Sequence, residues 1–305
     1  MFLFSFALLW RALYLHQMAA GSPFFDAPMA DAQAFFQQAE QFAATFSLGE
    51  EPFTGPPLYP AFLGVLYRLF GADFFAFRLI QFTLGALSVV LLYLIGRRVF
   101  SPGVGLAAGA AAAVYGPLIY FEGELLPPGV AILLNLSLVL FLLRAGTVSR
   151  PWSCLAAGLL LGVAGLAVAH VFLFGLGVAG WILQRRDQGL PARLGRVLLL
   201  ALGVFLVIGG TTWRNYHKGG DLVLLSSDSG LSFFLGNNPD RERTAGLGPG
   251  AEWDELIRQP VREGLEKPSE QSAFFWRAAI SFAREEPAAF LRSLAAKAFH
   301  FWQGG

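Results

Sequence analysis

The chain of 305 residues is long enough for one large or two ordinary soluble domains, but its composition is that of a membrane protein. Hydrophobic residues make up 55% and charged residues only 14%, whereas a typical globular chain has about 45–50% and about 25%. The single cysteine and the 30 phenylalanines exclude a disulfide scaffold and a disordered chain, and the net charge of +1 gives no electrostatic basis for nucleic-acid binding.

Apolar runs of about 17–22 residues, the length a helix needs to cross about 30 Å of hydrocarbon, recur along the chain. They predict transmembrane helices near residues 1–17, 76–96, 102–121, 128–145, 152–168, 169–184 and 197–213. We therefore predict an all-α polytopic membrane protein with about seven to eight transmembrane helices and a small mixed outer-face segment. The expected domains are a transmembrane domain at 1–213, a soluble segment at 214–292 and the start of a truncated helix at 293–305.

Charged residues indicate the orientation, because basic and acidic connections alternate along the chain. The basic connections carry Arg97, Arg98, Arg144, Arg150, Arg185, Arg186, Arg193 and Arg196. The acidic connections carry Asp26, Asp31, Glu40, Glu50, Glu51, Asp73, Glu122 and Glu124. Positive connections stay inside, so we expect a cytoplasmic N-terminus in an inner cell membrane. The loop at 18–75 and the segment at 214–292 then share the outer, periplasmic side.

The first outer loop is predicted to contain two amphipathic helices. From Asp31 the aromatic residues Phe35, Phe36, Phe42 and Phe46 follow helical spacing, which is typical of a helix at the membrane interface. The prolines of the segment 55–60 interrupt the chain, and a second amphipathic run follows at 61–70. We expect these helices to lie flat on the outer leaflet as a roof.

Acidic residues of the outer loops are candidates for acid–base chemistry. Asp26 and Asp31 flank the start of the first amphipathic helix, where an aspartate either caps the helix or accepts a proton from an acceptor hydroxyl. Glu122 and Glu124 share the predicted outer face and are either solvated loop acids or substrate-binding groups.

Basic residues inside or beside the apolar runs are candidates for binding an anionic substrate. Arg11 and Arg78 lie where an unpaired cation costs a few kcal/mol unless it reaches the interface or finds a partner such as a phosphate. Tyr59 is an interfacial aromatic, and His170 lies at a break between two runs. The four histidines show no metal-binding spacing, so no cofactor is assigned and a divalent metal stays open.

The soluble segment is predicted to contain a short strand at 222–226, a turn-rich stretch at 227–247 and helices near 251–264 and 269–284. About half of all acids and bases of the chain lie within residues 214–292.

Several short motifs, taken in their order, are similar to those of one enzyme family. They are Phe24-Phe25-Asp26-Ala-Pro28-Met-Ala-Asp31, Pro56-Pro57-Leu58-Tyr59-Pro60-Ala-Phe62-Leu63-Gly64, Leu69-Phe70-Gly71, Arg78-Leu-Ile-Gln81, Gly96-Arg97-Arg98-Val-Phe100, Trp213-Arg214-Asn215-Tyr216 and Gly236-Asn237-Asn238-Pro239. The chain thereby resembles bacterial members of the dolichyl-phosphate-mannose–protein mannosyltransferase superfamily, the integral-membrane glycosyltransferases of the C type and family 39.

The resemblance implies an inverting sugar transfer from a polyprenyl-phosphate-linked donor to an acceptor hydroxyl of a protein, lipid or cell-envelope glycan. It implies an aspartate of the first outer loop as general base, and basic side chains that hold the lipid phosphate. Asp31 matches the first acid of the family's Asp-Glu-Ala-x-Tyr pattern, which reads Asp31-Ala-Gln-Ala-Phe35 here, and Asp26 is the reserve candidate. The metal ligand and lysine of the aminoarabinose-transferring branch are replaced by Thr54-Gly55, so neither is transferred.

Two other functions stay open at this point. One is a transporter or flippase for lipid-linked saccharides, which would favour internal repeats that the chain lacks. The other is a truncated, non-catalytic member of the family, because both ends of the chain look clipped.

Overall fold

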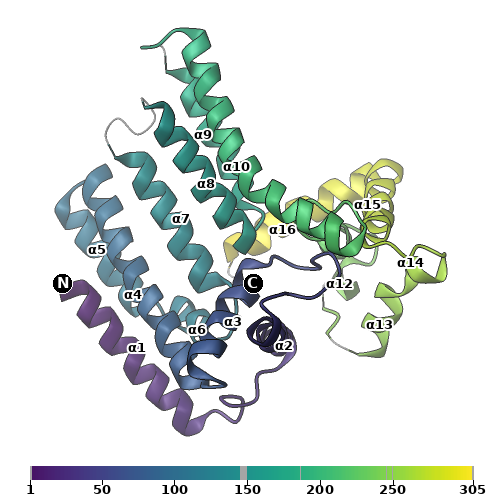
Figure 1. The fold of residues 1–305 in the computed structure, drawn as a ribbon, viewed down its shortest axis with the longest axis horizontal. Coiled ribbons are helices and arrows are strands. Elements are labelled where there is room, and N and C mark those ends of the chain that lie inside the picture. The colour runs from purple at the N-terminus through teal and green to yellow at the C-terminus, as the bar shows by residue number, and fades with distance from the viewer. Residues whose placement is uncertain (1, 145–149, 186, 245, 249, 304–305) are drawn as a thin grey trace. The chain divides into compact units, whose positions relative to one another are not determined.

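The computed structural model describes residues 2–144, 150–185, 187–244, 246–248 and 250–303, and these residues form helices and no strand (Figure 1). The chain divides into two compact units. Unit 1 comprises Met1–Glu50 and Pro56–Thr211, and unit 2 comprises Glu51–Gly55 and Thr212–Gly305. Arg186 and the predicted helix ends at Met1, Ala145 and 304–305 lie outside the described residues.

Ten helices begin in the described part of unit 1, and the last of them continues into unit 2. They are α1 (Phe2–Gly21), α2 (Ala30–Thr45), α3 (Leu58–Phe70), α4 (Phe74–Val99), α5 (Pro102–Val114), α6 (Gly116–Gly123), α7 (Pro128–Leu143), α8 (Pro151–Ala167), α9 (Val171–Gln184) and α10 (Leu190–Gly219). Local sequence explains several starts. Asp73 and Ser101 cap α4 and α5 by accepting hydrogen bonds from the N–H groups of Ala76 and Val104.

Helix α4 is central to unit 1, where it packs against α1, α5, α6 and α7. Its residues Phe77, Phe82, Ala86 and Val89 are buried. A separate apolar core forms where α7, α8, α9 and α10 meet. Helices α7, α8, α9 and α10 run side by side in Figure 1. In α4, Arg78 lies near the N-terminal end, and Arg97 and Arg98 lie in the last turn at the other end.

The two helices predicted in the first loop are confirmed as α2 and α3. They pack together through aromatic rings: Phe35 meets Tyr59 edge-on at 5.2 Å between centroids, and Phe36 lies 5.6 Å from Tyr67. Figure 1 looks along the axis of α2, whereas α4, α7 and α8 lie in the plane of the picture, so α2 runs across those helices. That the two helices lie flat on a membrane stays a prediction.

The all-α membrane class is confirmed, but the predicted number of membrane spans is too high. Among the described residues only α4 and α10 are long and apolar enough to cross a membrane alone, and α5 with α6 makes a third if that pair, bent by 52°, is one span. Helices α7, α8 and α9 have 16, 17 and 14 residues. At 1.5 Å per residue they are about 21–26 Å long, shorter than the roughly 30 Å hydrocarbon core.

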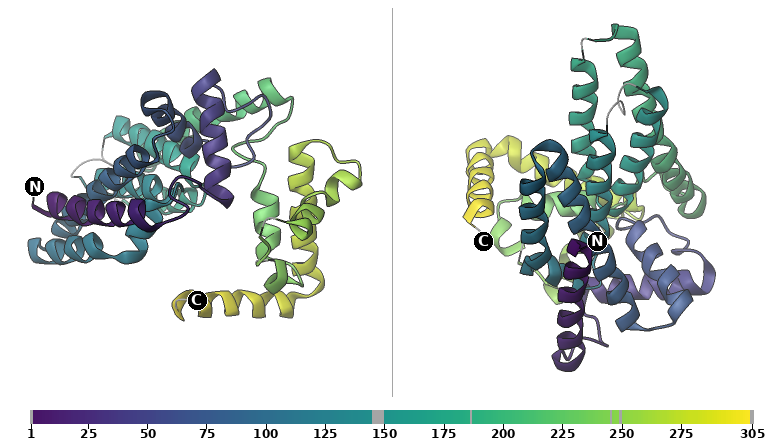
Figure 2. Two further views of the ribbon diagram at one scale, coloured as in Figure 1. Left: turned by 90° about the horizontal axis from the view of Figure 1, so that it is seen from below. Right: turned by 90° about the vertical axis from the view of Figure 1, so that its left-hand side faces the viewer.

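The regular secondary structure in the described part of unit 2 is helical (Figure 2). Its further helices are α11 (Ser229–Gly236), α12 (Arg241–Thr244), α13 (Ala251–Ile257), α14 (Gln259–Arg262), α15 (Pro268–Glu285) and α16 (Pro287–Gln303). Helix α15 matches the helix predicted at 269–284, whereas the helix predicted at 251–264 is divided into α13 and α14.

The strand predicted at 222–226 is wrong, so the segment is not mixed. The backbone groups of residues 223–227 form hydrogen bonds with partners that are not in a second strand. The side-chain amide of Asn215 donates to the carbonyls of Val223 and Leu225 at 3.0 and 3.3 Å, and the N–H of Ser227 donates to the carbonyl of Phe53 at 2.9 Å. The carbonyls of Val223 and Leu225 thus bond to one asparagine side chain and not to the N–H groups of a neighbouring strand.

The close approach of α4 and α5 predicts a sharp difference between two glycines of α5. A Cβ at Gly105 would lie 2.6 Å from the backbone nitrogen of Arg97 and from the carbonyl oxygen of Tyr93, whereas a Cβ at Gly103 meets only the Ser101 hydroxyl at 3.9 Å. We expect Gly105→Ala to destabilise the protein by about 1–3 kcal/mol, since backbone atoms must move. Gly103→Ala is the matched control and should stabilise the helix by about 0.5–1 kcal/mol. Thermal unfolding in detergent measures both, and equal midpoints would contradict the close packing of α4 on α5.

Candidate functional site

A buried ion pair connects α1 to α6 inside unit 1. Arg11 and Glu122 are 0% and 1% exposed, with Nε 2.6 Å from Oε2 and Nη2 3.2 Å from Oε1. Arg11 Nη1 also donates to the carbonyls of Ala7 and Ala113. The carboxylate of Glu122 occupies space beside α4 that exists because residue 85 is a glycine, since a Cβ there would overlap it. Both charges are thus satisfied within the protein, and direct contact of either with a substrate stays a prediction.

Three successive carbonyls at the end of α6 are held by two side chains of α4. Gln81 Nε2 donates to the carbonyls of Glu122 and Glu124 at 2.9 and 2.8 Å. Arg78 Nε donates to the carbonyl of Gly123, between them, at 2.9 Å. The last carbonyls of a helix have no partner inside the helix, so these bonds satisfy the carbonyls of Glu122 and Gly123. The carbonyl of Glu124 also accepts a hydrogen bond from the N–H of Leu126 at 2.9 Å.

Tyr59 connects α3 to the same network. Its hydroxyl donates to Oε1 of Gln81 at 2.8 Å, and both side chains are almost fully buried. Sequence reasoning did not name Gln81 as a site residue. The sequence indicated Gln81 only by its position, one helical turn after Arg78 and at the end of the motif Arg78-Leu-Ile-Gln81. We call Tyr59, Arg78, Gln81, Glu122 and Glu124 the α4–α6 cluster.

Arg78 connects the α4–α6 cluster to the first loop. Its Nη1 donates to the carbonyl of Phe25 at 2.8 Å, and its guanidinium lies 4.2 Å from the centre of the Phe25 ring. Glu124 and Asp26 both lie close enough to act on Arg78 electrostatically. Arg78 is only 2% exposed, and within the described part of the chain its Nη2 donates no hydrogen bond, so the two N–H groups of that nitrogen are unused.

Asp31 lies in the first turn of the neighbouring helix α2. Its side chain is exposed and makes no hydrogen bond or ion pair among the described residues. It does not cap the helix, because the N-cap position is Met29 and no side chain caps there. One turn later Phe35 packs on Tyr59, so Asp31 shares a helix face with a neighbour of the cluster. Ala30, directly before it, has φ of 52°, a left-handed conformation that costs a non-glycine residue about 1–2 kcal/mol.

The structure therefore brings together most of the residues that the sequence singled out. Arg11, Tyr59, Arg78, Glu122 and Glu124 form one connected set with Asp26 at its edge. His170 is exposed at the start of α9 and makes none of the hydrogen bonds that join the described residues of the cluster. Within the described residues no group of three or more His, Cys, Asp or Glu side chains is arranged to hold a metal ion.

The fold and the cluster define an all-α membrane protein with a polar, charged site at one end of its helices. Residues 54–213, just over half of the chain, match the family described as dolichyl-phosphate-mannose-protein mannosyltransferase. The chain belongs to this family and is a glycosyltransferase of the C type. No curated protein and no solved structure matches it. The matched residues include the α4–α6 cluster but neither Asp26 nor Asp31.

The buried ion pair predicts a large effect of removing one charge. We expect Glu122→Gln to destabilise unit 1 by about 3–5 kcal/mol, because Arg11 is then a buried cation without a counter-charge. The double variant Arg11→Met, Glu122→Leu removes both charges and should recover much of that loss. Thermal unfolding in detergent measures the three proteins. The ion pair would be contradicted if Glu122→Gln were as stable as the parent protein, or if the double variant were less stable than Glu122→Gln.

Proposed function

We propose that the protein transfers a sugar from a polyprenyl-phosphate-linked donor to an acceptor hydroxyl, inverting the anomeric centre. The acceptor oxygen attacks the anomeric carbon, the bond from that carbon to the phosphate oxygen breaks, and a carboxylate receives the hydroxyl proton. The lipid phosphate leaves with the bonding electrons. This chemistry requires one free carboxylate and a cation near the departing phosphate, and it requires no nucleotide fold.

The observation that carries the proposal is the state of Arg78. Its three hydrogen bonds to the described residues all go to backbone carbonyls, which fix the guanidinium without neutralising its charge. Its remaining donors, the two N–H groups of Nη2, can each donate a hydrogen bond to a phosphate oxygen. A fixed cation at the place where negative charge develops stabilises the transition state at little reorganisation cost.

Asp31 is the proposed general base and Asp26 the reserve. Asp31 has both carboxylate oxygens free among the described residues, as a proton acceptor requires, whereas Asp26 lies in the electrostatic field of Arg78. The strained Ala30 next to Asp31 supports this choice, since backbone strain is concentrated at functional sites. We further propose that this end of the helices faces the periplasm, with the arginines at the other end of α4 in the cytoplasm.

The first test is sugar release from a panel of radiolabelled polyprenyl-phosphate sugars in proteoliposomes. We expect Asp31→Asn to lower turnover at least about a hundredfold, the lower end of the contribution of a general base. Asp26→Asn should have a smaller effect, and Asp187→Asn is the matched control. Asp187 is an exposed aspartate between α9 and α10, on the predicted cytoplasmic side.

Three outcomes are distinguishable. Turnover that survives Asp31→Asn but is lost in Asp26→Asn would transfer the role of base to Asp26. Turnover that survives both substitutions would exclude a first-loop aspartate as the base. No turnover with any donor, even for a version of the protein extended at its C-terminus, would contradict the proposed reaction.

A second test concerns the phosphate. We expect Arg78→Lys to lower kcat/KM for the donor by about 10²–10³-fold, because an ammonium lacks the planar fork whose separate nitrogens reach the carbonyls of Gly123 and Phe25 and leave Nη2 for the phosphate. Arg68→Lys is the matched control, since Arg68 also donates to a carbonyl and stacks on a phenylalanine but lies outside the cluster. Equal kinetics of the two variants would remove Arg78 from donor binding.

A further inference from the structure

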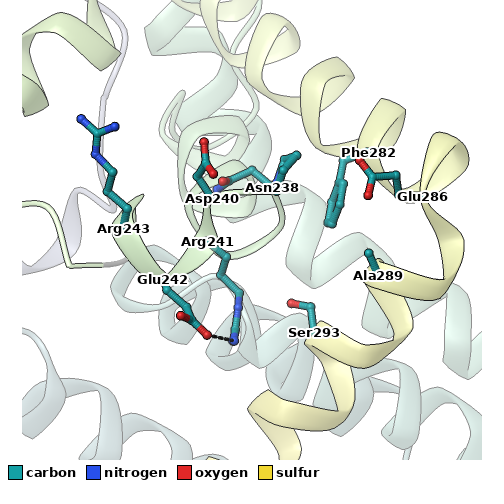
Figure 3. A pocket seen from close by; sticks show the side chains of 10 residues that line it. Asn238, Asp240, Arg241, Glu242, Arg243, Phe282, Glu286, Ala289 and Ser293 are labelled. Carbon is teal, nitrogen blue, oxygen red and sulfur yellow. Dashed lines mark ion pairs between the residues drawn. The ribbon is translucent and has the colours of Figure 1, made fainter.

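Unit 2 contains a cavity of about 380 Å³ that the proposed chemistry does not use. Its volume lies within the roughly 300–1,000 Å³ of ligand sites. The loop that follows α11, together with α12, forms one side, and the end of α15 with α16 forms the other (Figure 3). The residues that line it are Asn238, Pro239, Asp240, Arg241, Glu242, Arg243, Phe282, Glu286, Ala289 and Ser293.

The cavity offers hydrogen-bond acceptors that the protein itself leaves free. Asp240 and Glu286 are exposed, and their carboxylates make no hydrogen bond or ion pair among the described residues. Asn238 is only 3% exposed, and its Nδ2 is fixed by bonds to the carbonyl of Phe234 and the hydroxyl of Thr244, both at 2.8 Å. Its Oδ1 receives no hydrogen bond from the described residues and is held ready for a donor.

The same cavity offers donors. The hydroxyl oxygen of Ser293 is buried and has no hydrogen-bond partner in the described structure. The Arg241 side chain is 20% exposed, and its ion pair with Glu242 is long, at 3.7 Å. Arg243, by contrast, points away from the other labelled side chains in Figure 3 and pairs with Glu252 at 3.2 Å. Phe282 and Ala289 add an apolar wall.

The cavity lining limits the class of ligand. The carboxylates of Asp240 and Glu286, which have no partner among the described residues, repel an anion. Free donors and acceptors next to an apolar wall suit a neutral ligand whose hydroxyls both donate and accept and whose C–H faces are apolar. We propose that this cavity binds a neutral saccharide, and that the acceptor of the transfer is therefore a glycan. The second half of this inference depends on the proposed function.

A second cavity beside the first gives room for a further sugar residue. It has a volume of about 330 Å³ and shares Asn238, Pro239, Asp240 and Arg243 with the first. Both cavities thus border the same loop, so an oligosaccharide that fills both should bind more tightly than a monosaccharide.

The test is saccharide binding to the full chain in lipid nanodiscs without any sugar donor, followed by saturation-transfer NMR. The probes are neutral mono- and oligosaccharides, a uronic-acid-containing oligosaccharide and a neutral peptide. We expect the neutral oligosaccharides to bind, and the double variant Asp240→Asn, Glu286→Gln to weaken that binding at least about tenfold, as for lost hydrogen bonds to charged groups. Glu263→Gln is the control, because Glu263 is an exposed carboxylate that lines neither cavity.

Unchanged affinity in the double variant would overturn the inference, and so would preferential binding of the acidic oligosaccharide or the peptide. The proposed function fails separately. Saccharide binding that persists in Asp31→Asn while no donor supports transfer would retain the saccharide site and remove the reaction. Transfer that persists without any saccharide binding would retain the proposed reaction and exclude the saccharide site.

Discussion

The need to neutralise two charges inside an apolar unit determines how the site of this glycosyltransferase is built. A buried cation without a partner is costly, and Arg11 meets that requirement through the bidentate contact with Glu122. The pair fixes α6 against α1. The carbonyls of residues 122, 123 and 124 then face α4, where Gln81 and Arg78 donate hydrogen bonds to them. One ion pair therefore sets the position of a whole network.

The consequence is that Arg78 is held in place without losing its charge. Backbone carbonyls are dipoles and not counter-ions, so a guanidinium bound by them keeps its full positive charge. Glu124 and Asp26 lie near enough to moderate its field, but among the described residues neither forms an ion pair with Arg78. Arg11 and Arg78 looked alike in the sequence, as two arginines in apolar runs. Their surroundings make the first a structural charge and leave the second with free donors.

That distinction could not be predicted from the sequence, and the reason is separation along the chain. Arg11 and Glu122 are 111 residues apart, and no local pattern relates them. Local patterns did predict the helices of the first loop, where Phe35 and Phe36 follow helical spacing, and the all-α class. They overestimated the number of spans, because an apolar run does not reveal where a helix such as α7 stops. They also suggested a strand at 222–226, where carbonyls bind the remote side chain of Asn215.

The acidic side chains of unit 1 also differ in whether they already have a hydrogen-bond or ion-pair partner. Glu122 is neutralised by Arg11, Asp73 caps α4, and Glu40 accepts a hydrogen bond from Tyr67 at 3.2 Å. Each of these carboxylates stabilises the fold, and protonating it would weaken the contact that it makes. Asp31 has no such contact among the described residues, yet its helix is fixed to the cluster through Phe35 and Tyr59. A carboxylate that is positioned by its backbone and unused by its side chain can gain and lose a proton at little cost to the fold.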